Sequence, residues 1–394
     1  MIKPTDLQNI VSAIVALDAA QDKLYSIAGG SIDSGNAKAA RMTSQERLDY
    51  FRSEEFRHWV ACERAAGRQV FWLKDVDKTQ GAGDIFTFFF KWRADNGKFT
   101  VKQLAVIADY LEKNRKQREN QGQPQIKNQQ APTSWSARML AAIKKACQSF
   151  GQSKNSNNSE VSELGPHEAL RLWLNKEAGG DGIAMMDFWT NVYWPSQVGL
   201  SKAEKLAQVT AFAPLYANKA YPGVKEENEL LESIGVTVVI VSNGDQELAI
   251  AVAPVLGVKP ENVVGSHLIY DKNGISTGVN HSYEVGGEEW HAKPQPGKPL
   301  SFHYWLHINR ARFGWSRIDE RKFVIAGRDG DSASTDGGMM ILMHPCAIGN
   351  FMINTPGEPA RLEKFLAVAS KYGWTVGQFI TLDHSPSKTG YRPD

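Results

Sequence analysis

The hydrophobic pattern is clearest after Pro222, where apolar runs alternate with amphipathic stretches. Residues 235–241 (GVTVVIV) form a β-branched run typical of a buried strand, and residues 322–326 form a second one. Around them the pattern predicts short apolar runs at 263–264 and 339–343, a hairpin-like stretch at 271–274, and helices at 225–234, 245–256, 298–313 and 358–372. Strands that alternate with helices predict an α/β fold with a parallel sheet and helices on both faces.

The first half of the chain has mainly helical spacing, with one strand-like run at 69–73 (QVFWL). Helical patterns cover 1–69, with a Gly/Ser-rich break at 29–35, and also 84–114 and 166–220. Segments rich in Gln, Asn and Ser, at 117–134 and 148–160, are expected to be exposed or disordered loops around a helix at 135–147. We therefore expect an N-terminal helical segment (1–68), a core (69–80 and 233–394) and a mainly helical inserted cap (81–232).

Composition narrows the class of partner. The 45 Lys and Arg residues nearly balance 43 Asp and Glu residues, so the net charge of +2 offers no basic surface for nucleic acid. The three cysteines, Cys62, Cys147 and Cys346, lack disulfide or zinc spacing and favour a reducing compartment. No apolar run approaches a membrane span. We expect a small-molecule partner and a cytoplasmic location, with a periplasmic or secreted one open if a signal peptide was removed; the oligomeric state is open.

Polar residues follow the predicted strands at four places, and ligands of parallel sheets bind beyond such strand ends. These places are Asp75-Val-Asp77-Lys-Thr79, Ser242-Asn243, Lys298 in Pro-Gly-Lys-Pro, and Gly330-Asp331-Ser-Ala-Ser-Thr-Asp336. Clustered carboxylates need a hard cation between them, and all-oxygen ligands favour Mg²⁺. Together with a lysine and a hydroxyl, they suit phosphoryl transfer through an aspartyl-phosphate.

The ordered set DVDKT, VSNG, PGK and GDSASTD resembles motifs I to IV of the haloacid dehalogenase (HAD) superfamily of phosphatases. The long insertion after the first motif is similar to the phosphoserine-phosphatase-like branch, and several stretches resemble bacterial phosphorylcholine phosphatases. Those stretches are 236–242, 259–265 and 326–339. The resemblance covers about 69–80 and 222–355, and it implies a Rossmann-like core with a cap.

The resemblance implies roles for the first motif and for the metal. Asp75 would be the nucleophile and a metal ligand. Asp77 would be the general acid and base, and its backbone carbonyl would bind the metal. Thr79 would shape the loop, and Asp331 would be the acidic Mg²⁺ ligand.

The resemblance also implies how the phosphate is held. Ser242 and the amide of Asn243 would bind phosphate, and Lys298 would stabilise the charge of the aspartyl-phosphate. Asp336 would support Asp331 or Lys298. The implied function is a Mg²⁺-dependent phosphomonoesterase acting on a small phosphate ester, such as phosphocholine or a related phosphorylated alcohol or amino acid.

Some residues depart from the family pattern. Lys74 directly precedes the nucleophile, and Gln80 replaces the usual apolar residue after the threonine. Asp329 competes with Asp331 as a metal ligand. Lys293 competes with Lys298, which we prefer because it opens a helix.

Two questions stay open at this stage. Trp189, Tyr193 and Trp194 form either a cage for a quaternary ammonium group or part of the cap core. The departures, together with the polar insert, leave two alternatives to a small-ester phosphatase. One is a protein phosphatase or phosphotransferase on the same fold, and the other is a catalytically inactive binding protein.

Overall fold

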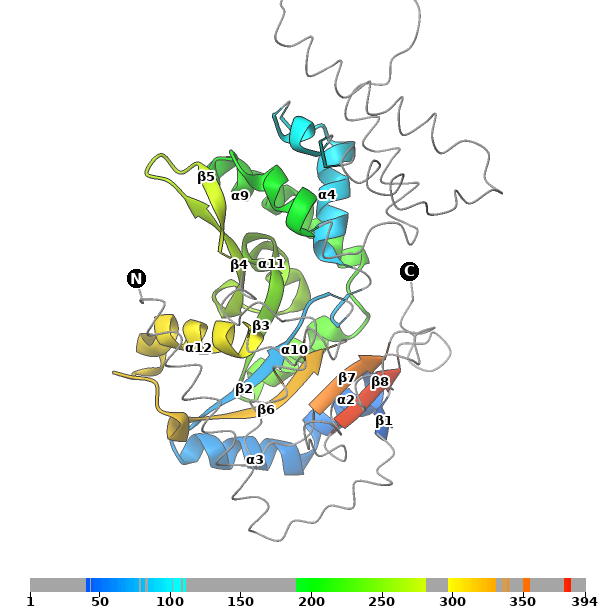
Figure 1. Ribbon diagram of the computed structural model, residues 1–394. Coiled ribbons are helices and arrows are strands. Elements are labelled where there is room, and N and C mark those ends of the chain that lie inside the picture. Colours follow the sequence, from blue (N-terminus) through cyan, green and yellow to red (C-terminus); the bar gives the residue numbers. More distant parts are fainter. Residues whose placement is uncertain are drawn as a thin grey trace, which may run out of the picture. The chain divides into compact units, whose positions relative to one another are not determined.

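The structure is a computed structural model (Figure 1). It describes residues 40–42, 44–77, 79–81, 84–100, 102–107, 109–110, 189–280, 297–330, 336, 339, 350–354 and 379–383. The chain divides into two compact units. Unit 1 comprises Met1–Ile85, Ala213–His267 and Asn280–Asp394, and unit 2 comprises Phe86–Phe212 and Leu268–Val279.

The described strands form one sheet in the order β1-β8-β7-β6-β2-β3-β4-β5. Their bounds are β1 Ala40–Met42, β2 Gln69–Lys74, β3 Val236–Asp245, β4 Val263–Tyr270, β5 Ser276–Asn280, β6 Phe323–Gly330, β7 Asn350–Asn354 and β8 Phe379–Asp383. Neighbours from β1 through β4 in this order pair in parallel, which confirms the α/β fold class. From β2 the strands follow in chain order through β3, β4 and β5 on one side, and through β6, β7 and β8 on the other. The topological switch point of the sheet therefore lies beside β2.

The helices mostly follow the predicted spacing. Their bounds are α2 Ser44–Arg52, α3 Glu54–Ala65, α4 Ile85–Asp95, α9 Lys202–Phe212, α10 Val224–Ser233, α11 Gln246–Val252 and α12 Gly297–Asn309. Short helical turns are η1 Trp189–Tyr193, η2 Pro195–Gln197, η3 Ala213–Asn218, η4 Ala253–Leu256, η5 Pro260–Asn262, η7 Arg310–Phe313 and η8 Glu320–Lys322. The expected helices at 135–147 and 358–372 lie outside the described residues.

The sequence prediction of a mostly helical 1–69 needs one correction. Ala40–Met42 is a strand, and it pairs in parallel with β8. Three residues are too few to show a period of two, so the pattern could not reveal the strand. Its partner lies about 340 residues away, at Ile380–Leu382.

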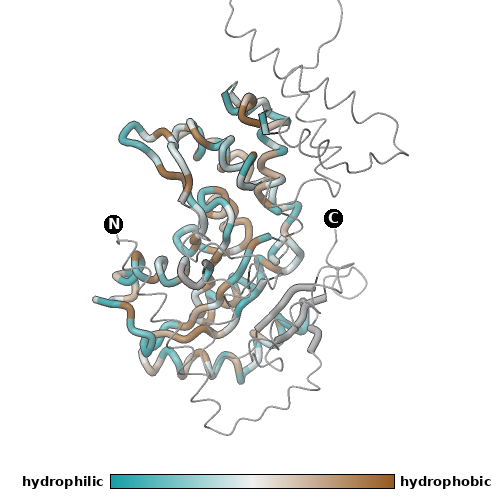
Figure 2. The backbone as a smooth tube through the Cα atoms, in the orientation of Figure 1, coloured by the Kyte–Doolittle hydropathy of each residue, from teal (hydrophilic) through white to brown (hydrophobic). Residues whose placement is uncertain are grey.

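Alternating side chains of β2 enter two different layers of unit 1. Phe71 contacts Phe302 and Trp305 of α12, at ring-centroid distances of 5.5 and 6.0 Å. Trp72 points to the other face, where it meets Phe51 of α2 at 4.9 Å and Phe56 of α3. Helices therefore cover both faces of the central strand, and the N-terminal helices form one of these layers. Figure 2 shows the hydrophobic stretches that lie along the buried strands.

Trp72 also requires a glycine on the adjacent strand. A Cβ atom at Gly327 of β6 would overlap the six-membered part of the indole of Trp72. The strand pairing shifts register at this point, between Phe71 and Trp72. The glycine thus lets a fully buried tryptophan lie flat against its neighbour strand.

Unit 2 has an aromatic core. Phe86 and Phe90 of α4 pack on η1, and Phe89 packs on Phe212 of α9 at 5.3 Å. A hairpin of 268–279 belongs to this unit because Ser276 exchanges backbone hydrogen bonds with Gly199 and Leu200. These bounds differ from the expected cap of 81–232, since 213–232 lies in unit 1 and the hairpin in unit 2.

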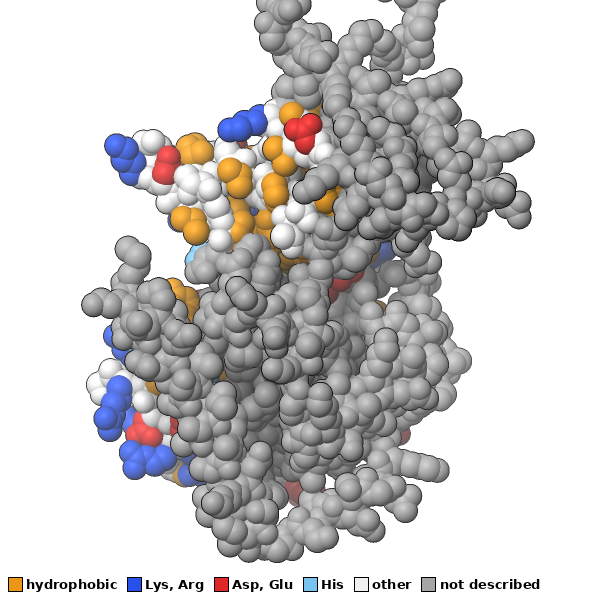
Figure 3. Space-filling view, viewed as in Figure 1, with side chains coloured by type: hydrophobic (Ala, Val, Ile, Leu, Met, Phe, Trp, Pro, Cys, Tyr) orange, Lys and Arg blue, Asp and Glu red, His pale blue; other side chains and the backbone are white. Residues whose placement is uncertain are grey.

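Unit 2 exposes some apolar side chains to solvent. Leu206 of α9 and Ile269 of β4 are 63% and 47% exposed, and Figure 3 shows hydrophobic side chains on the face of unit 2 that it presents. Of the helices in the described ranges, none is both long enough and apolar enough to cross a membrane.

Candidate active site

The end of β2 sends two adjacent charged side chains to opposite faces of the sheet. Lys74 continues the face of Trp72, and Asp75 continues the face of Phe71, because side chains alternate along an extended chain. The backbone stays in register with β6, where the amide of Asp75 donates to the carbonyl of Asp329 at 2.9 Å. Asp75 therefore leaves the sheet on the side of α12.

Three predicted site residues meet on that side. Lys298, in the first turn of α12, places its Nζ 2.7 Å from Oδ1 of Asp75 and also pairs with Asp336. All three side chains are at least 92% buried. The structure thus joins three segments of sequence that were predicted separately.

A glycine makes the approach of Asp336 possible. A Cβ atom at Gly330, the last residue of β6, would overlap the Cβ and carboxyl group of Asp336. The Gly-Asp-Ser-Ala-Ser-Thr-Asp stretch therefore begins with a residue whose missing side chain leaves room for its last one.

The charges of this group shift each other's proton affinity. Burial raises the pKa of Asp75 to about 7, with Lys298 opposing the rise and Asp336 adding to it. For Lys298, burial lowers the pKa, but the carboxylates of Asp336 and Asp75 outweigh burial and raise it above its ordinary value. Lys298 is therefore always protonated, and it lies beside a carboxyl group whose pKa is close to neutral pH.

Asp77 is fixed by the start of α4. Its Oδ1 accepts a hydrogen bond of 2.7 Å from the backbone amide of Ile85, the first residue of that helix. Burial raises the pKa of Asp77 well above its ordinary value, and the negative charges of Asp84 and Asp75 raise it further. Asp84 was missed at the sequence level, although its place one residue before a helix was a usable signal.

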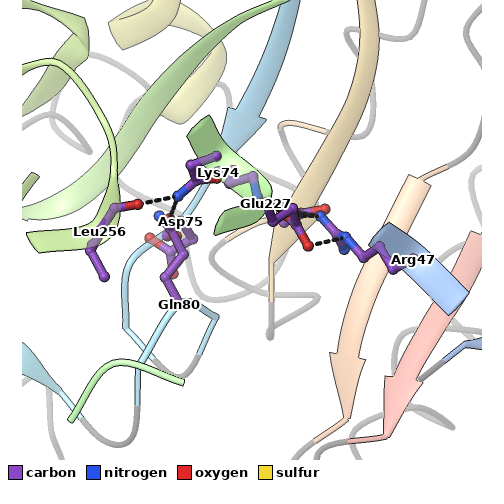
Figure 4. Close-up of polar contacts among 8 residues, drawn as sticks. Arg47, Lys74, Asp75, Gln80, Glu227 and Leu256 are labelled. Carbon is purple, nitrogen blue, oxygen red and sulfur yellow. Dashed lines mark hydrogen bonds and ion pairs between the residues drawn. The ribbon is translucent and has the colours of Figure 1, made fainter. Parts of the chain in front are cut away.

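The loop after Asp77 folds back toward Asp75. Thr79 is buried, and the amides of Thr79 and Gln80 donate to the carbonyl of Val76 at 3.3 and 3.0 Å. Gln80 then donates from Nε2 to the carbonyl of Asp75 at 2.8 Å (Figure 4). Its Oε1 accepts from Asn228 of α10 at 2.8 Å, and the same Asn228 amide donates to the carbonyl of Leu256.

Lys74, the other departure from the family pattern, is part of a buried ion cluster. It pairs with Glu227 of α10 and lies 3.3 Å from Oδ2 of Asp329. Arg47 of α2 completes the cluster, since it binds Glu227 through two nitrogens, at 2.7 and 2.8 Å (Figure 4). Arg47 also pairs with Asp329. Two cations thus face two anions on the sheet face opposite to Lys298.

This ion cluster bears on the competition between Asp329 and Asp331. The Oδ2 atom of Asp329 is held by Arg47 and Lys74, on the Lys74 side of the strand. Asp329 is therefore an ion-pair partner in the layer of α2 and α10. Asp331 lies outside the described residues, and so does Lys293, whereas Lys298 is described and contacts Asp75.

Ser242 and Asn243 lie at the end of the neighbouring strand. Lys74 pairs in register with Ile240, so Ser242 follows at the level of Val76. Ser242 Oγ accepts from the amide of Gly244 at 2.9 Å, and the carbonyl of Asn243 accepts from Ser266 at 2.7 Å. Asp245, rather than Ser242, caps α11.

The aromatic cluster of Trp189, Tyr193 and Trp194 is packed as a core. The three side chains are at most 6% exposed, and their ring centroids lie 5.2 to 5.5 Å apart. Phe86 covers Trp189 as well. The rings are buried and in contact with one another, so of the two interpretations the structure supports the core.

Within the described ranges, no group of three or more His, Cys, Asp or Glu side chains is arranged to hold a metal ion. The predicted set includes only two described carboxylates, Asp75 and Asp77. Its third member, Asp331, lies outside those ranges.

No protein-family model matches this sequence, and no curated protein matches it either. The chain is similar to a conserved protein of unknown function from Anaerococcus prevotii, at 13% identity over 81% of this chain and 91% of that one, with a TM-score of 0.48. It is similar to a phosphoserine phosphohydrolase-like protein from Francisella tularensis, at 12% identity over 73% and 87%, with a TM-score of 0.30. A HAD family hydrolase from Salmonella enterica follows at 11% identity over 80% and 76%, with a TM-score of 0.30. At these identities and TM-scores, the likeness assigns no function to this chain.

Proposed function

We propose that this protein is a Mg²⁺-dependent phosphomonoesterase of the HAD type, with Asp75 as its nucleophile. The observation that carries the proposal is the buried contact of one lysine, Lys298, with both Asp75 and Asp336 beyond the ends of β2 and β6. Lys298 holds a fixed positive charge beside the carboxyl group of Asp75, whose ionised form can attack phosphorus.

In the first step, a carboxylate oxygen of Asp75 attacks phosphorus and the bond to the leaving alcohol breaks. Lys298, which stays protonated, lies within reach of the equatorial phosphate oxygens and offsets their charge. Ser242, at the same edge of the sheet, supplies a hydroxyl for these oxygens. The products are an aspartyl-phosphate and an alcohol.

Asp77 is the proposed general acid and base. Because its pKa is raised, a protonated carboxyl group is available to give its proton to the leaving oxygen. The amide of Ile85 keeps this carboxyl group in one orientation. In the second step Asp77 takes a proton from water, the water oxygen bonds to phosphorus, and inorganic phosphate leaves Asp75.

The described residues fit Mg²⁺ in charge and chemistry. Asp75 and Asp77 are buried carboxylates whose like charges raise the pKa of Asp77, so a cation near them relieves repulsion. Mg²⁺ is commonly held by one or two carboxylates and keeps several waters. When bound, it would neutralise charge between the nucleophile and the phosphate; Asp331 is the further proposed ligand.

The substrate is proposed to be a small phosphate ester. The packed rings of Trp189, Tyr193 and Trp194 do not offer free faces to a quaternary ammonium group, so they give phosphocholine no advantage over phosphoserine or another phosphorylated alcohol. The assignment of 81–232 to a cap that selects the leaving group stays a prediction. The alternative, a protein phosphatase or phosphotransferase on the same fold, also stays a prediction.

The departures from the motifs do not favour an inactive binding protein. Lys74 and Gln80 are both tied to α10, and Gln80 holds the backbone of Asp75 itself. These residues support the position of the nucleophile and do not obstruct it.

The test is Asp75→Asn, assayed with p-nitrophenyl phosphate and a panel of phosphomonoesters in the presence of Mg²⁺. We expect wild-type turnover and complete loss in the variant, with the melting temperature retained. Asp49→Asn, an exposed change on α2, serves as the matched control and should keep full activity. Turnover by Asp75→Asn at the wild-type rate would exclude Asp75 as nucleophile, and no turnover by the wild type would exclude the function.

A further inference from the structure

Tyr216 presents a buried hydroxyl group without a hydrogen-bond partner. The residue lies on η3, where the chain re-enters unit 1, and it is only 1% exposed. Across the described part of the chain, its Oη makes no hydrogen bond. A buried hydroxyl without a hydrogen-bond partner lowers the free energy of unfolding, and such groups are uncommon in native proteins. Those that occur often serve function.

The hydroxyl lies directly against the loop of the proposed nucleophile. A Cβ atom at Gly81 would overlap Oη of Tyr216, so the two are in close contact. The two segments are also joined by backbone pairing, since Tyr221 donates to the carbonyl of Gln80 at 3.0 Å and Gly81 bridges to Ala220. The position of Oη is therefore set relative to the loop of 75–81.

Tyr216 lies on the side of Asp77. Gly81, which its hydroxyl contacts, forms an isolated β-bridge with Asp77. Burial and then the charge of Asp77 raise the pKa of Tyr216 above its ordinary value, so the hydroxyl stays protonated. The hydroxyl is thus a donor on the side of the proposed general acid.

We propose that Tyr216 Oη donates a hydrogen bond to the leaving-group oxygen of the phosphate ester, beside Asp77. The inference rests on the proposed function and adds to it a catalytic residue that none of the four motifs contains. The acceptor that the hydroxyl lacks within the protein arrives with the substrate. As the ester bond breaks, this oxygen gains negative charge, and the hydrogen bond strengthens.

This role has a consequence that a structural role lacks. The alkoxide of phosphoserine or phosphocholine is strongly basic and therefore a poor leaving group. Its departure depends on proton or hydrogen-bond donors to the leaving oxygen. The p-nitrophenolate group is stable without help. Loss of the hydroxyl should therefore slow alkyl esters much more than p-nitrophenyl phosphate.

The experiment compares Tyr216→Phe with the wild type on phosphoserine, phosphocholine and a series of aryl phosphates of increasing leaving-group pKa, at saturating Mg²⁺. We expect kcat/KM to fall about tenfold or more for alkyl esters and less than about threefold for p-nitrophenyl phosphate. Across the aryl series the rate should depend more steeply on leaving-group pKa. The activity on p-nitrophenyl phosphate also shows that the variant is folded.

The control is Tyr304→Phe, which removes the same atom from an exposed position on α12. It should leave kcat/KM unchanged for both alkyl and aryl esters. Equal losses on both classes, or no loss on the alkyl esters, would overturn the role of Tyr216 while leaving the phosphatase intact. A wild type that hydrolyses none of these esters would overturn the proposed function, and the role of Tyr216 with it.

Discussion

The side-chain amide of Gln80 donates a hydrogen bond to the backbone carbonyl of Asp75, at 2.8 Å. The other end of the same side chain accepts from Asn228, a residue of α10 148 positions further along the chain. The backbone of the proposed nucleophile is thus anchored to a helix that packs on the sheet. A residue that departs from the motif by sequence supports the motif in three dimensions.

Gln80→Leu restores the apolar residue usual in the motif, and we expect it to damage this protein. The change removes the bond to Asp75 and leaves the buried amide of Asn228 with one acceptor fewer. The free energy of unfolding should fall by about 1–3 kcal/mol, and kcat should fall with little change in KM. Urea unfolding and steady-state kinetics test this; Gln45→Leu on the exposed face of α2 is the control. A fully active Gln80→Leu protein would show that the anchor is dispensable.

Glu227 should make stability depend on acid pH. Burial alone would raise the pKa of Glu227, but the charges of Arg47 and then Lys74 more than compensate, so the folded pKa lies below the ordinary value. Its stabilising contribution is therefore complete above the unfolded pKa of about 4.3 and is lost as the pH falls through the folded pKa. Glu227→Gln should lower the free energy of unfolding by about 3–5 kcal/mol at neutral pH, since it leaves two buried cations facing Asp329 alone.

The measurement is urea unfolding of both proteins at several pH values between about 7 and 3. The difference between wild type and Glu227→Gln should shrink as the pH falls below about 4.3. Glu229→Gln, on the exposed side of the same helix, should show a small and constant difference. A gap that widens in acid would have the wrong sign for a lowered pKa.

Mg²⁺ should stabilise the folded protein by binding near Asp75 and Asp77. We expect the melting temperature of the wild type to rise with Mg²⁺ concentration, because ligands that bind only the folded state stabilise it. Asp77→Asn keeps an oxygen for the amide of Ile85 but removes a carboxyl group whose ionisation the fold opposes, as its raised pKa indicates. This variant should melt higher than wild type without metal, at neutral pH, and respond less to Mg²⁺. Identical Mg²⁺ responses in both proteins would show that binding of the ion does not depend on the side-chain carboxyl group of Asp77.

Gly330→Ala should lower the proposed phosphatase activity although it replaces no charged residue. The new Cβ atom would overlap Asp336 and push it from Lys298. We expect a loss of kcat of at least about tenfold and lowered stability. Gly278→Ala is the matched control, since its Cβ atom would meet nothing nearer than Ile269 at 4.0 Å. If Gly330→Ala turned over substrate normally, Asp336 would not be needed at Lys298.

Much of the fold could be predicted from the chain. The apolar runs before Asp75, Ser242 and Gly330 are long and β-branched or aromatic enough to mark β2, β3 and β6. The short strands β1, β5, β7 and β8 were not separately predicted, because strands of three to five residues show too little of their period.

The candidate site divides in the same way. The polar residues after each strand were visible, and parallel strands bring their carboxyl ends to one edge, so a shared site followed from topology. Asp84 and Tyr216 were missed. Asp84 precedes helix α4 but belongs to none of the four motifs. Tyr216 lies in an aromatic-rich stretch, where nothing in the local sequence distinguishes a catalytic hydroxyl.

By itself, the sequence determined the class of fold and the chemical groups that meet at its edge, since both depend on local periodicity and on residues next to strands. Only the tertiary structure decided which groups touch. It paired Lys298 with Asp75 and Asp336, turned Asp329 toward Arg47 and Lys74, and tied Gln80 to Asn228. Lys74 and Glu227 are 153 residues apart, and no local pattern encodes such a contact, because it depends on how a helix from a distant segment packs on the sheet.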